Sequence, residues 1–385
     1  MTQTFDAIIC GGGLAGSAAG FSLARAGYSV AILDRALFPR KKLCGGLLTW
    51  KSIQLLEHLF GETPGSLTKA GAINFASNRY AIHTLATPLA EGELSFPFHF
   101  VDRTVFDAHL LTRAEAAGAT VFQGCKVTAC DPAKGIITCH NGDTFQGAFV
   151  IGADGANSVV RKSFPDVDRD RMRRFMAPAI EIHLDAKDFP RPVEYPELYV
   201  GFLEAGYGWV FPNHNSVIVG TCGLRMNNSN IYQLFKEFLD FFNIDSAATS
   251  DLRGHPLPYG NYLENPVSGV TMLAGDAGGF VEPLLGEGIF FALCTGMYAG
   301  EAVAHGLATK TSPGPTYTHR LHQQIMPELK ASNRLRWALF KGMQWIGPSS
   351  LKLLVNATNT QLAEMVHGMR SYSWLRKKHW DFCKR

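Results

Sequence analysis

A glycine-rich stretch near the start of the chain constrains the fold more than any other feature. It runs from Phe5 to Asp34 and reads FDAIICGGGLAGSAAGFSLARAGYSVAILD. The apolar run Ala7–Cys10 predicts a buried parallel strand, an alanine-rich helical pattern ends near Gly27, and Tyr28–Leu33 predicts a second strand. A strand, a glycine turn, a helix and a second strand in this order predict a Rossmann-like α/β unit.

The turn itself has the spacing Gly11-x-Gly13-x-x-Gly16. The first glycine allows a tight turn, the second admits a pyrophosphate, and the third lets the helix pack on the strand. Unpaired N–H groups at the helix N-terminus favour phosphate, and Asp34 can accept hydrogen bonds from an adenosine ribose. A glycine turn alone is weak evidence, but here all the parts fall in register, so we predict a nucleotide-cofactor site.

Length and composition limit the classes of protein that fit. The chain has 385 residues, of which 18% are charged and 46% hydrophobic, enough for two domains or one core with a large insertion. Its formal net charge of +3 is too small to indicate nucleic-acid binding. The eight cysteines show no metal-ligand spacing, so we expect no metal and a reduced, cytoplasmic chain.

The sequence indicates neither a secretory signal nor a membrane-spanning helix. The first strand begins almost at the initiator Met, so we expect no secretory signal. No apolar run reaches the roughly 18 residues that a membrane-spanning helix needs.

Changes in periodicity divide the chain into three regions. Alternating stretches in residues 70–100 and 177–269 predict antiparallel strands of one sheet, a substrate domain inserted in two pieces. Residues 1–69, 101–176 and 270–310 predict the nucleotide-binding domain, and residues 311–385 a C-terminal helical region. The predicted fold class is α/β, with a Rossmann-like nucleotide-binding domain, an inserted antiparallel-sheet substrate domain and C-terminal helices.

Two further glycine-containing segments end predicted strands, and a third follows the second of them along the chain. They are Asp154-Gly155, Gly275-Asp276 and Pro283-x-x-Gly286-x-Gly288, the last of which precedes a long helix. Ligands of doubly wound sheets bind at the carboxyl ends of the strands, where glycines permit close backbone approach and a carboxylate can hold sugar hydroxyls. The dipole of the last helix would stabilise negative charge on a bound ring. We therefore add to the cofactor site Asp154, Gly155, Asp276, Pro283, Gly286 and Gly288.

With these motifs the sequence resembles the FAD-dependent oxidoreductases of the p-hydroxybenzoate hydroxylase superfamily, and within it the geranylgeranyl reductase-like family. The general motifs are the glycine turn, a helix-opening Arg103, the Asp154-Gly155 pair, and GDAGGFVEPLLGEG ending at Gly288. The narrower ones are Lys42-Leu-Cys44-Gly45-Gly46 and Tyr207-Gly-Trp209-Val-Phe211-Pro212. In the family a spaced GxG follows the second motif, whereas Gly220-Thr221-Cys222-Gly223 has one more residue between its glycines.

The resemblance implies that FAD is the cofactor, and that Arg103, Cys44 and Gly45 also contact it. It implies catalytic roles for Cys44, Tyr207 and Trp209. From the residues alone, Cys44 is either a thiol proton donor or a small residue in a tight turn. The alternating aromatics of residues 207–211 are either a packed core face or the wall of an apolar pocket. We predict that the two segments meet across the flavin ring.

The reaction stays open among three functions. The first is an isoprenoid or quinone-like lipid reductase that transfers hydride from the reduced flavin, as the resemblance implies. The second is a monooxygenase that hydroxylates an aromatic ring or a polypeptide side chain, and the third is a non-catalytic assembly or redox-sensing protein. Because the chain has no second GxGxxG, we expect NAD(P)H to visit transiently or a protein to supply the electrons.

The C-terminal stretch Arg370–Arg385, RSYSWLRKKHWDFCKR, mixes aromatic and basic residues. Such a stretch is either a solvated basic end with a few packed aromatics or an anchor on the surface of an anionic membrane. The second alternative would make the protein peripheral to a membrane.

Overall fold

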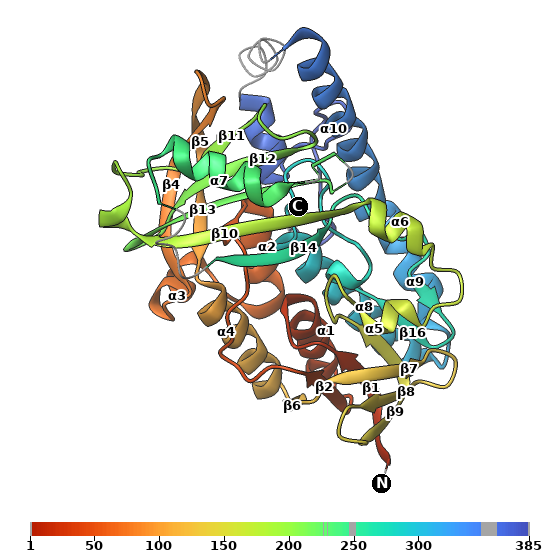
Figure 1. Cartoon of the computed structure of the whole chain (residues 1–385). Coiled ribbons are helices and arrows are strands. Elements are labelled where there is room, and N and C mark those ends of the chain that lie inside the picture. The colour runs from red at the N-terminus through yellow and green to blue at the C-terminus, as the bar shows by residue number, and fades with distance from the viewer. Residues whose placement is uncertain (1, 226, 229, 246–251, 348–359, 384–385) are drawn as a thin grey trace.

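Parallel strands form the centre of the first sheet, which lies at the bottom of Figure 1. This computed structural model describes residues 2–225, 227–228, 230–245, 252–347 and 360–383. Ala7 lies opposite Val30 on one side and Phe149 on the other, so the carboxyl ends of the strands share one edge. In spatial order the central strands are β16 (Thr271–Leu273), β9 (Thr144–Gly152), β1 (Thr2–Cys10), β2 (Val30–Asp34) and β6 (Thr120–Gln123).

Short antiparallel strands complete this sheet. They are β15 (Val267–Ser268), β7 (Val127–Asp131) and β8 (Ile136–Cys139). A disulfide joins Cys125, just before β7, to Cys139 at the end of β8. The expectation of a fully reduced chain is therefore wrong for this pair, because the hairpin brings the two thiols together.

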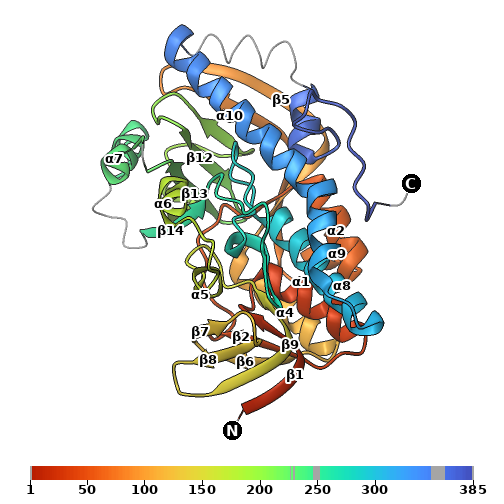
Figure 2. The ribbon, with the colours of Figure 1, turned by 90° about the vertical axis from the view of Figure 1, so that its right-hand side faces the viewer.

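The second sheet is antiparallel except where β11 pairs with β4. It occupies the upper part of Figures 1 and 2. Its strands come from separated segments, in the spatial order β14 (Arg253–Pro258), β10 (Met176–Asp185), β13 (Ser216–Gly223), β12 (Gly206–Pro212), β11 (Glu197–Tyr199), β4 (Ile73–His83), β5 (Pro88–Val101) and β3 (Leu47–Leu48). The predicted antiparallel sheet built from two insertions is thus confirmed, with the addition of β3 from the loop after β2.

Two helices pack directly on each other and against the first sheet. They are α1 (Leu14–Arg25) and α8 (Ile289–Thr309). An ideal Cβ on Gly296 would lie 2.2 Å from the carbonyl oxygen of Ala15, and one on Gly300 would lie 2.7 Å from that of Ala19. Glycines in α8 therefore allow the close approach that carries α8, with its buried apolar faces, over the parallel strands.

The remaining helices surround the sheets. α2 (Trp50–Phe60) and α4 (Arg103–Ala116) join the core of the first sheet, and α7 (Ile231–Phe241) covers one face of the second. The others are α3 (Pro64–Lys69), α5 (Val159–Lys162), α6 (Arg169–Arg174), α9 (Pro313–Arg320) and α10 (Met326–Ile346). Figure 2 shows α10 running from the level of α2 up to the level of the second sheet. The predicted α/β class with C-terminal helices is confirmed.

The C-terminal stretch folds back on the core. Residues 360–367 are helical, and beyond them Trp380 and Phe382 are buried, with the Trp380 ring 4.7 Å from that of Phe290. Trp374 is 88% exposed. Residues 348–359 of the predicted helical region and 384–385 of the basic stretch lie outside the described residues. Within the described residues, no helix is long and apolar enough to cross a bilayer.

Candidate active site

The glycine turn lies at the carboxyl edge of the first sheet. Gly11 has φ +105°, and an ideal Cβ on it would lie 2.3 Å from the carbonyl oxygen of Ala153. An ideal Cβ on Gly16 would lie 1.8 Å from the carbonyl oxygen of Gly11. Both glycines are therefore required by the packing of strand, turn and helix, whatever ligand the turn holds.

Gly13 differs from the other two glycines because it borders open space. The Nη2 atom of Arg40, 3.3 Å away, is the nearest group that a Cβ on Gly13 would meet. Gly13 is the N-cap of α1, and no side chain caps that helix or places an acid in its first turn. Helix N–H groups beside a guanidinium, with room in front of them, fit a pyrophosphate.

Asp34 fixes the shape of this turn. Its buried carboxylate accepts hydrogen bonds from the N–H groups of Gly12, at 2.7 Å, and Ala36, at 2.8 Å. The predicted contact with a ribose would add to these two bonds, since each carboxylate oxygen can accept more than one.

Cations of the loop after β2 and of α4 are paired with carboxylates at the site. Arg103 donates two hydrogen bonds to Asp107, at 2.7 and 2.9 Å, and Arg40 lies 3.2 Å from the same carboxylate. Burial alone would raise the pKa of Asp107, but Arg103 and Arg40 hold it below its usual value. On the other side, Lys42 lies 3.8 Å from Asp276. Arg40 and Lys42 of this loop are thus paired with carboxylates of the candidate site.

Asp276 faces the turn that begins α8. It lies in a short 3₁₀ turn, Gly275–Ala277, and an ideal Cβ on Gly288 would lie 3.8 Å from its Oδ1 atom. His255 of β14 lies near the same charges, and burial, reinforced by Lys42, lowers its pKa to about 4. A neutral His255 therefore faces Lys42 and Asp276 at the meeting of the two sheets.

Asp154 and Gly155 lie at the same edge, but the Asp154 side chain points to its own chain. It accepts hydrogen bonds from the Ser158 hydroxyl, at 2.5 Å, and the N–H of Val159, at 2.6 Å. Burial raises the pKa of Asp154. Gly155 has φ +80° with open space around it. The observed contacts of Asp154 hold the start of α5, and a cofactor contact stays a prediction for both residues.

The turn Pro283–Gly288 is clamped from several elements. The Tyr207 hydroxyl of β12 donates to the carbonyl of Leu285, and Arg336 of α10 donates to that of Pro283 at 3.1 Å. The buried carboxylate of Glu282 accepts from the N–H groups of Leu284 and Leu285, each at 2.6 Å, and from the Ser332 hydroxyl. Burial raises the pKa of Glu282 to about 7. Tyr207, a predicted catalytic residue, is here bound to this turn.

The Cys44 loop and the aromatic strand lie against each other. An ideal Cβ on Gly45 would lie 2.6 Å from the Phe211 ring and 3.7 Å from Nε1 of Trp209. The N–H of Cys44 donates to the buried Glu181 of β10 at 3.0 Å, and the Cys44 thiol lies beside Arg103. The structure thus brings together the two segments that we expected to meet. The catalytic roles of Cys44, Tyr207 and Trp209 stay predictions.

An apolar cavity of about 300 Å³ lies between these segments. Its walls are Leu43–Leu47, the face of β12 with Tyr207, Trp209 and Phe211, the turn 284–289, and helix α10. The residues of α10 that line it are Leu335, Leu339, Phe340 and Met343. The aromatic strand is therefore both a packed face and a cavity wall, and the two interpretations of its pattern hold together.

Glu287 is the charged residue among the described residues that line this cavity. Its carboxylate lies 2.6 Å from Nζ of Lys51, whose side chain is 1% exposed, and accepts from the Thr49 hydroxyl at 2.8 Å. Lys51 also donates to the carbonyl of Val366 at 3.0 Å. A paired, largely buried carboxylate just before the N-cap of α8 can hold a proton or a charge next to a bound substrate.

Sequence reasoning missed the carboxylates that support the site, Asp107, Glu181 and Glu282, and also His255. The signal that could have found two of them is an acid inside an apolar run, as in AIEIHL around Glu181 and GFVEPLL around Glu282. A buried carboxylate must be hydrogen-bonded or paired, so such an acid indicates a specific partner.

The residues present fit FAD. The open space at Gly13 and the nearby Arg40 side chain suit its pyrophosphate. Asp34 and Asp276 offer acceptors for its sugar and ribityl hydroxyls. An apolar cavity bounded by the Gly286–Gly288 turn suits its ring. These groups lie along one edge, in the order that the strands set.

Comparison with known proteins agrees with this fit. The FAD binding domain family matches residues 4–323. Geranylgeranyl diphosphate reductase of Rhodobacter capsulatus is 30% identical over 77% of this chain and 74% of its own length. Menaquinone reductase of Mycolicibacterium smegmatis is 28% identical over 96% of this chain and 92% of its own. A geranylgeranyl bacteriochlorophyll reductase-like protein of Thermoplasma acidophilum has the same fold, with TM-score 0.74 and 19% identity, over 97% of this chain and 98% of that one.

The match to the family extends over most of the chain, and it includes both the glycine turn and the segment from Gly275 to Gly288. The chain therefore belongs to the FAD binding domain family and is an FAD-dependent oxidoreductase of the geranylgeranyl reductase family.

Proposed function

We propose that this enzyme saturates carbon–carbon double bonds in an isoprenoid or quinone-like lipid. The observation that supports this most directly is the apolar cavity between the Cys44 loop, the aromatic strand, the Gly286–Gly288 turn and α10. A cavity with such walls takes up an apolar chain and excludes water, and it borders the turn at which the ring of the cofactor would lie.

The chain offers specific groups to hold FAD. The N-terminus of α1 at Gly13, with Arg40, would bind the pyrophosphate, Asp34 the adenosine ribose, and Asp276 the ribityl chain. Arg103 would stand near the ring side, because it lies beside the Cys44 thiol. Bound FAD supplies hydride to an alkene once it is reduced.

The protein's own part in the reaction is to orient the chain of the lipid and to handle one proton. Trp209 and Phe211 present flat apolar walls, and Tyr207 holds the turn at Leu285 in place. Saturation of an alkene needs a proton at the carbon that does not receive hydride. The Cys44 thiol at the cavity wall is the group that we propose as its donor, with the Glu287–Lys51 pair behind it.

We further propose that residues 1–69, 101–176 and 270–310 form the FAD-binding domain, 70–100 and 177–269 the substrate domain, and 311–385 a helical region. The course of the two sheets supports this division, since β10 begins at Met176 and β5 ends at Val101. Electrons would come from a visiting NAD(P)H or from a protein reductant.

We also propose that the enzyme works at a membrane surface, where its lipid substrate resides. Trp345 and Ile346 at the end of α10 are 79% and 72% exposed, and Trp374 is exposed among basic residues. Tryptophan and basic side chains together favour the interfacial region of an anionic bilayer.

The test is an anaerobic incubation of the FAD-loaded, dithionite-reduced protein with prenyl lipids in detergent. We expect products heavier by two mass units for each double bond saturated. If conversion occurs only in a parallel incubation with oxygen and adds one oxygen atom to the substrate, the enzyme is a monooxygenase instead. Stable flavin binding with no conversion of either kind would support a non-catalytic flavoprotein.

A further inference from the structure

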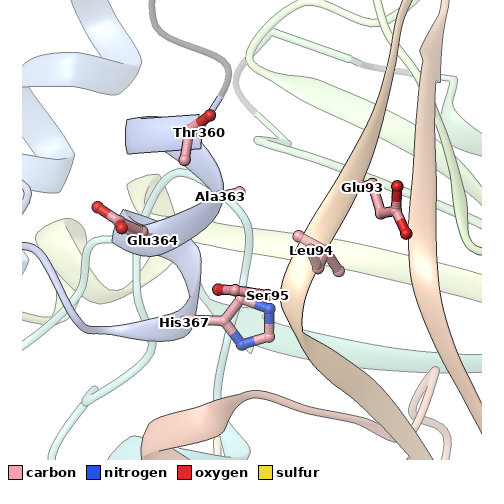
Figure 3. Close-up of a pocket in the computed structure, with 7 residues that line it drawn as sticks. All are labelled: Glu93, Leu94, Ser95, Thr360, Ala363, Glu364 and His367. Atoms are coloured by element: carbon pink, nitrogen blue, oxygen red, sulfur yellow. The ribbon is translucent and has the colours of Figure 1, made fainter.

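A second pocket lies between strand β5 and the helical residues 360–367, as Figure 3 shows. Its volume is about 360 Å³. Unlike the apolar cavity it has several polar residues in its lining, namely Glu93, Ser95, Thr360, Glu364 and His367, together with Leu94 and Ala363.

The two spaces are neighbours. Leu94 and Ala363 line both of them, so a wall of two small-to-medium apolar side chains lies between the pocket and the cavity. Leu94 is 4% exposed, and it comes from β5, whereas Ala363 comes from the helical segment opposite. A long molecule in the cavity would therefore have to pass only these two residues to place one end in the pocket, and Leu94 is the one with a side chain that can change rotamer.

His367 presents a buried hydrogen-bond donor at this pocket. It is 2% exposed, and its Nδ1 atom accepts a hydrogen bond from the N–H of Trp50 at 3.0 Å. A neutral ring with Nδ1 as acceptor carries its proton on Nε2. Burial lowers the pKa of His367 to about 3, and Lys51 adds to this effect, so the ring stays neutral.

The Nε2 atom has no hydrogen-bond partner among the described residues. The ring is held in place because it stacks on Phe98, with centroids 4.5 Å apart, and Figure 3 shows it reaching from its helix toward β5 beside Ser95. A buried donor without a partner costs free energy, which a ligand carbonyl or ether oxygen would recover.

The charges of the two spaces indicate which polar group can enter. The charged side chains among the described residues that line them are Glu93, Glu287 and Glu364, with no lysine or arginine. Three cations beside these spaces are already paired, Lys51 with Glu287, Arg370 with Glu364 and Arg103 with Asp107. Proteins bind diphosphate groups through lysine, arginine or helix N-termini. The N-terminus of α8 borders the cavity where we expect the flavin ring, and the carboxylates of the pocket would repel a diphosphate there.

Resting on the proposed function, we infer that the substrate is uncharged at its polar end, a prenylated quinone rather than a prenyl diphosphate. The isoprenoid chain lies in the apolar cavity, and the quinone ring lies in the pocket, where a carbonyl oxygen accepts a hydrogen bond from Nε2 of His367.

The test compares two substrates that share one chain, geranylgeranyl diphosphate and a naphthoquinone with four isoprene units. The reduced holoenzyme is given each in the same detergent, without oxygen, and saturation is measured by mass after reoxidation. We expect kcat/KM for the quinone to exceed that for the diphosphate by roughly tenfold or more. Equal or better conversion of the diphosphate would overturn the inference and leave the reductase standing, whereas conversion of neither would overturn the reductase itself.

A charge reversal locates the polar end. Glu93 is exposed on β5, so Glu93→Lys should fold normally and should raise kcat/KM for the diphosphate roughly fivefold. Glu115→Lys on the exposed face of α4 makes the same change in net charge away from both spaces and serves as the control. The same response in the two variants would overturn the placement in this pocket.

A second variant tests the donor. His367→Phe keeps the stacking on Phe98 and removes Nε2, and His367→Asn removes Nε2 but keeps an acceptor near the position of Nδ1 for the N–H of Trp50, so in both the KM for the quinone should rise with little change in kcat. Binding to the oxidised protein, measured by quenching of tryptophan fluorescence, should weaken in parallel. If a correctly folded His367→Phe protein binds the quinone as tightly as the parent, the hydrogen bond is not made.

Discussion

The two ends of the proposed active site differ in their side chains, which are charged at the cofactor end and apolar at the substrate end. At the cofactor end, charged side chains, as in Arg40–Asp107 and Lys42–Asp276, lie on main-chain turns at the carboxyl ends of strands. At the substrate end, aromatic and aliphatic side chains from many separate segments enclose an apolar space. The cofactor end binds by hydrogen bonds and charge, so single polar substitutions should weaken it, whereas the substrate end depends on packing and shape.

The largest effect, a loss of FAD binding, should come from filling the open space at Gly13. A Cβ added there meets only the movable Arg40 side chain, so we expect the protein to fold, but the valine side chain would take the space of the pyrophosphate. We expect Gly13→Val to purify without flavin and to bind added FAD at least roughly a thousandfold more weakly. Visible absorbance and fluorescence titration measure this.

The control for Gly13→Val is Gly65→Val, at the start of α3, where the nearest atom to an added Cβ is 3.7 Å away. This protein should retain FAD fully. Gly13→Val protein that retained FAD with native affinity would show that the cofactor end is wrongly placed.

At the substrate end, the corresponding change is Trp209→Ala. Trp209 is 6% exposed, and its ring fills the space that a side chain at position 220 would need, with 2.2 Å between an ideal Cβ on Gly220 and the ring. Truncation should cost about 3–5 kcal/mol of the free energy of unfolding. Chemical denaturation measures this, and the folded fraction should still bind FAD, because the cofactor end is separate.

Val210 gives a matched comparison, since its side chain lies on the opposite face of the same strand, in the core under α7. Val210→Ala should destabilise the protein as well, but it should leave lipid binding intact. If Trp209→Ala leaves lipid binding equally intact, the cavity is not where the substrate binds.

The sequence predicted these two ends unequally well. The turns at Gly11, Asp34 and Asp276 follow strands, and main-chain geometry alone fixes where they lie, so a local motif is enough to place them. The cavity depends on which side chains meet across the fold. The contribution of α10 through Leu335 and Phe340 was not predicted, because a helical period indicates a buried face but not its partner.

The stability that Glu282 contributes by holding the Pro283–Gly288 turn, which lies between the two ends, should depend on pH. The folded pKa of Glu282 is about 7, above the ordinary value of 4.5, because of burial. A raised pKa means that the stability it contributes is fully present below pH 4.5 and is lost as the pH rises through about 7. The loss should amount to about 3 kcal/mol.

Glu282→Gln cannot titrate, and its one carbonyl oxygen keeps an acceptor for one of the N–H groups of Leu284 and Leu285, which bond different oxygens of Glu282. We expect its free energy of unfolding to vary less between pH 4.5 and 7 than that of the parent, as measured by urea denaturation at each pH. Identical pH profiles for the two proteins would show that Glu282 does not titrate in this range.

Cys44 lies where the two ends meet, and its substitution tests whether its thiol donates the proton or is only a small residue in a tight turn. A serine is close in size but far less acidic, so if the thiol donates the proton, Cys44→Ser should lower kcat about a hundredfold with FAD affinity unchanged. Cys130→Ser on β7 is the control, because that thiol is half-buried and remote from the cavity. Full activity in Cys44→Ser would leave Cys44 as a small residue in a tight turn.

The smallest effect should come from a single acceptor at the cofactor end. Asp276 lies between Lys42 and the Gly288 turn, where it would bind the ribityl chain by a charge-assisted hydrogen bond worth about 1.5–3 kcal/mol. Asp276→Ala should therefore weaken FAD affinity roughly ten- to a hundredfold and leave the apolar cavity unchanged. The exposed Asp166→Ala removes the same charge elsewhere and should not affect affinity. Because the substrate end contains no part of this contact, lipid binding measured at saturating FAD should be the same in both variants. A loss of lipid binding in Asp276→Ala alone would show that the two ends are coupled through the Gly288 turn rather than independent.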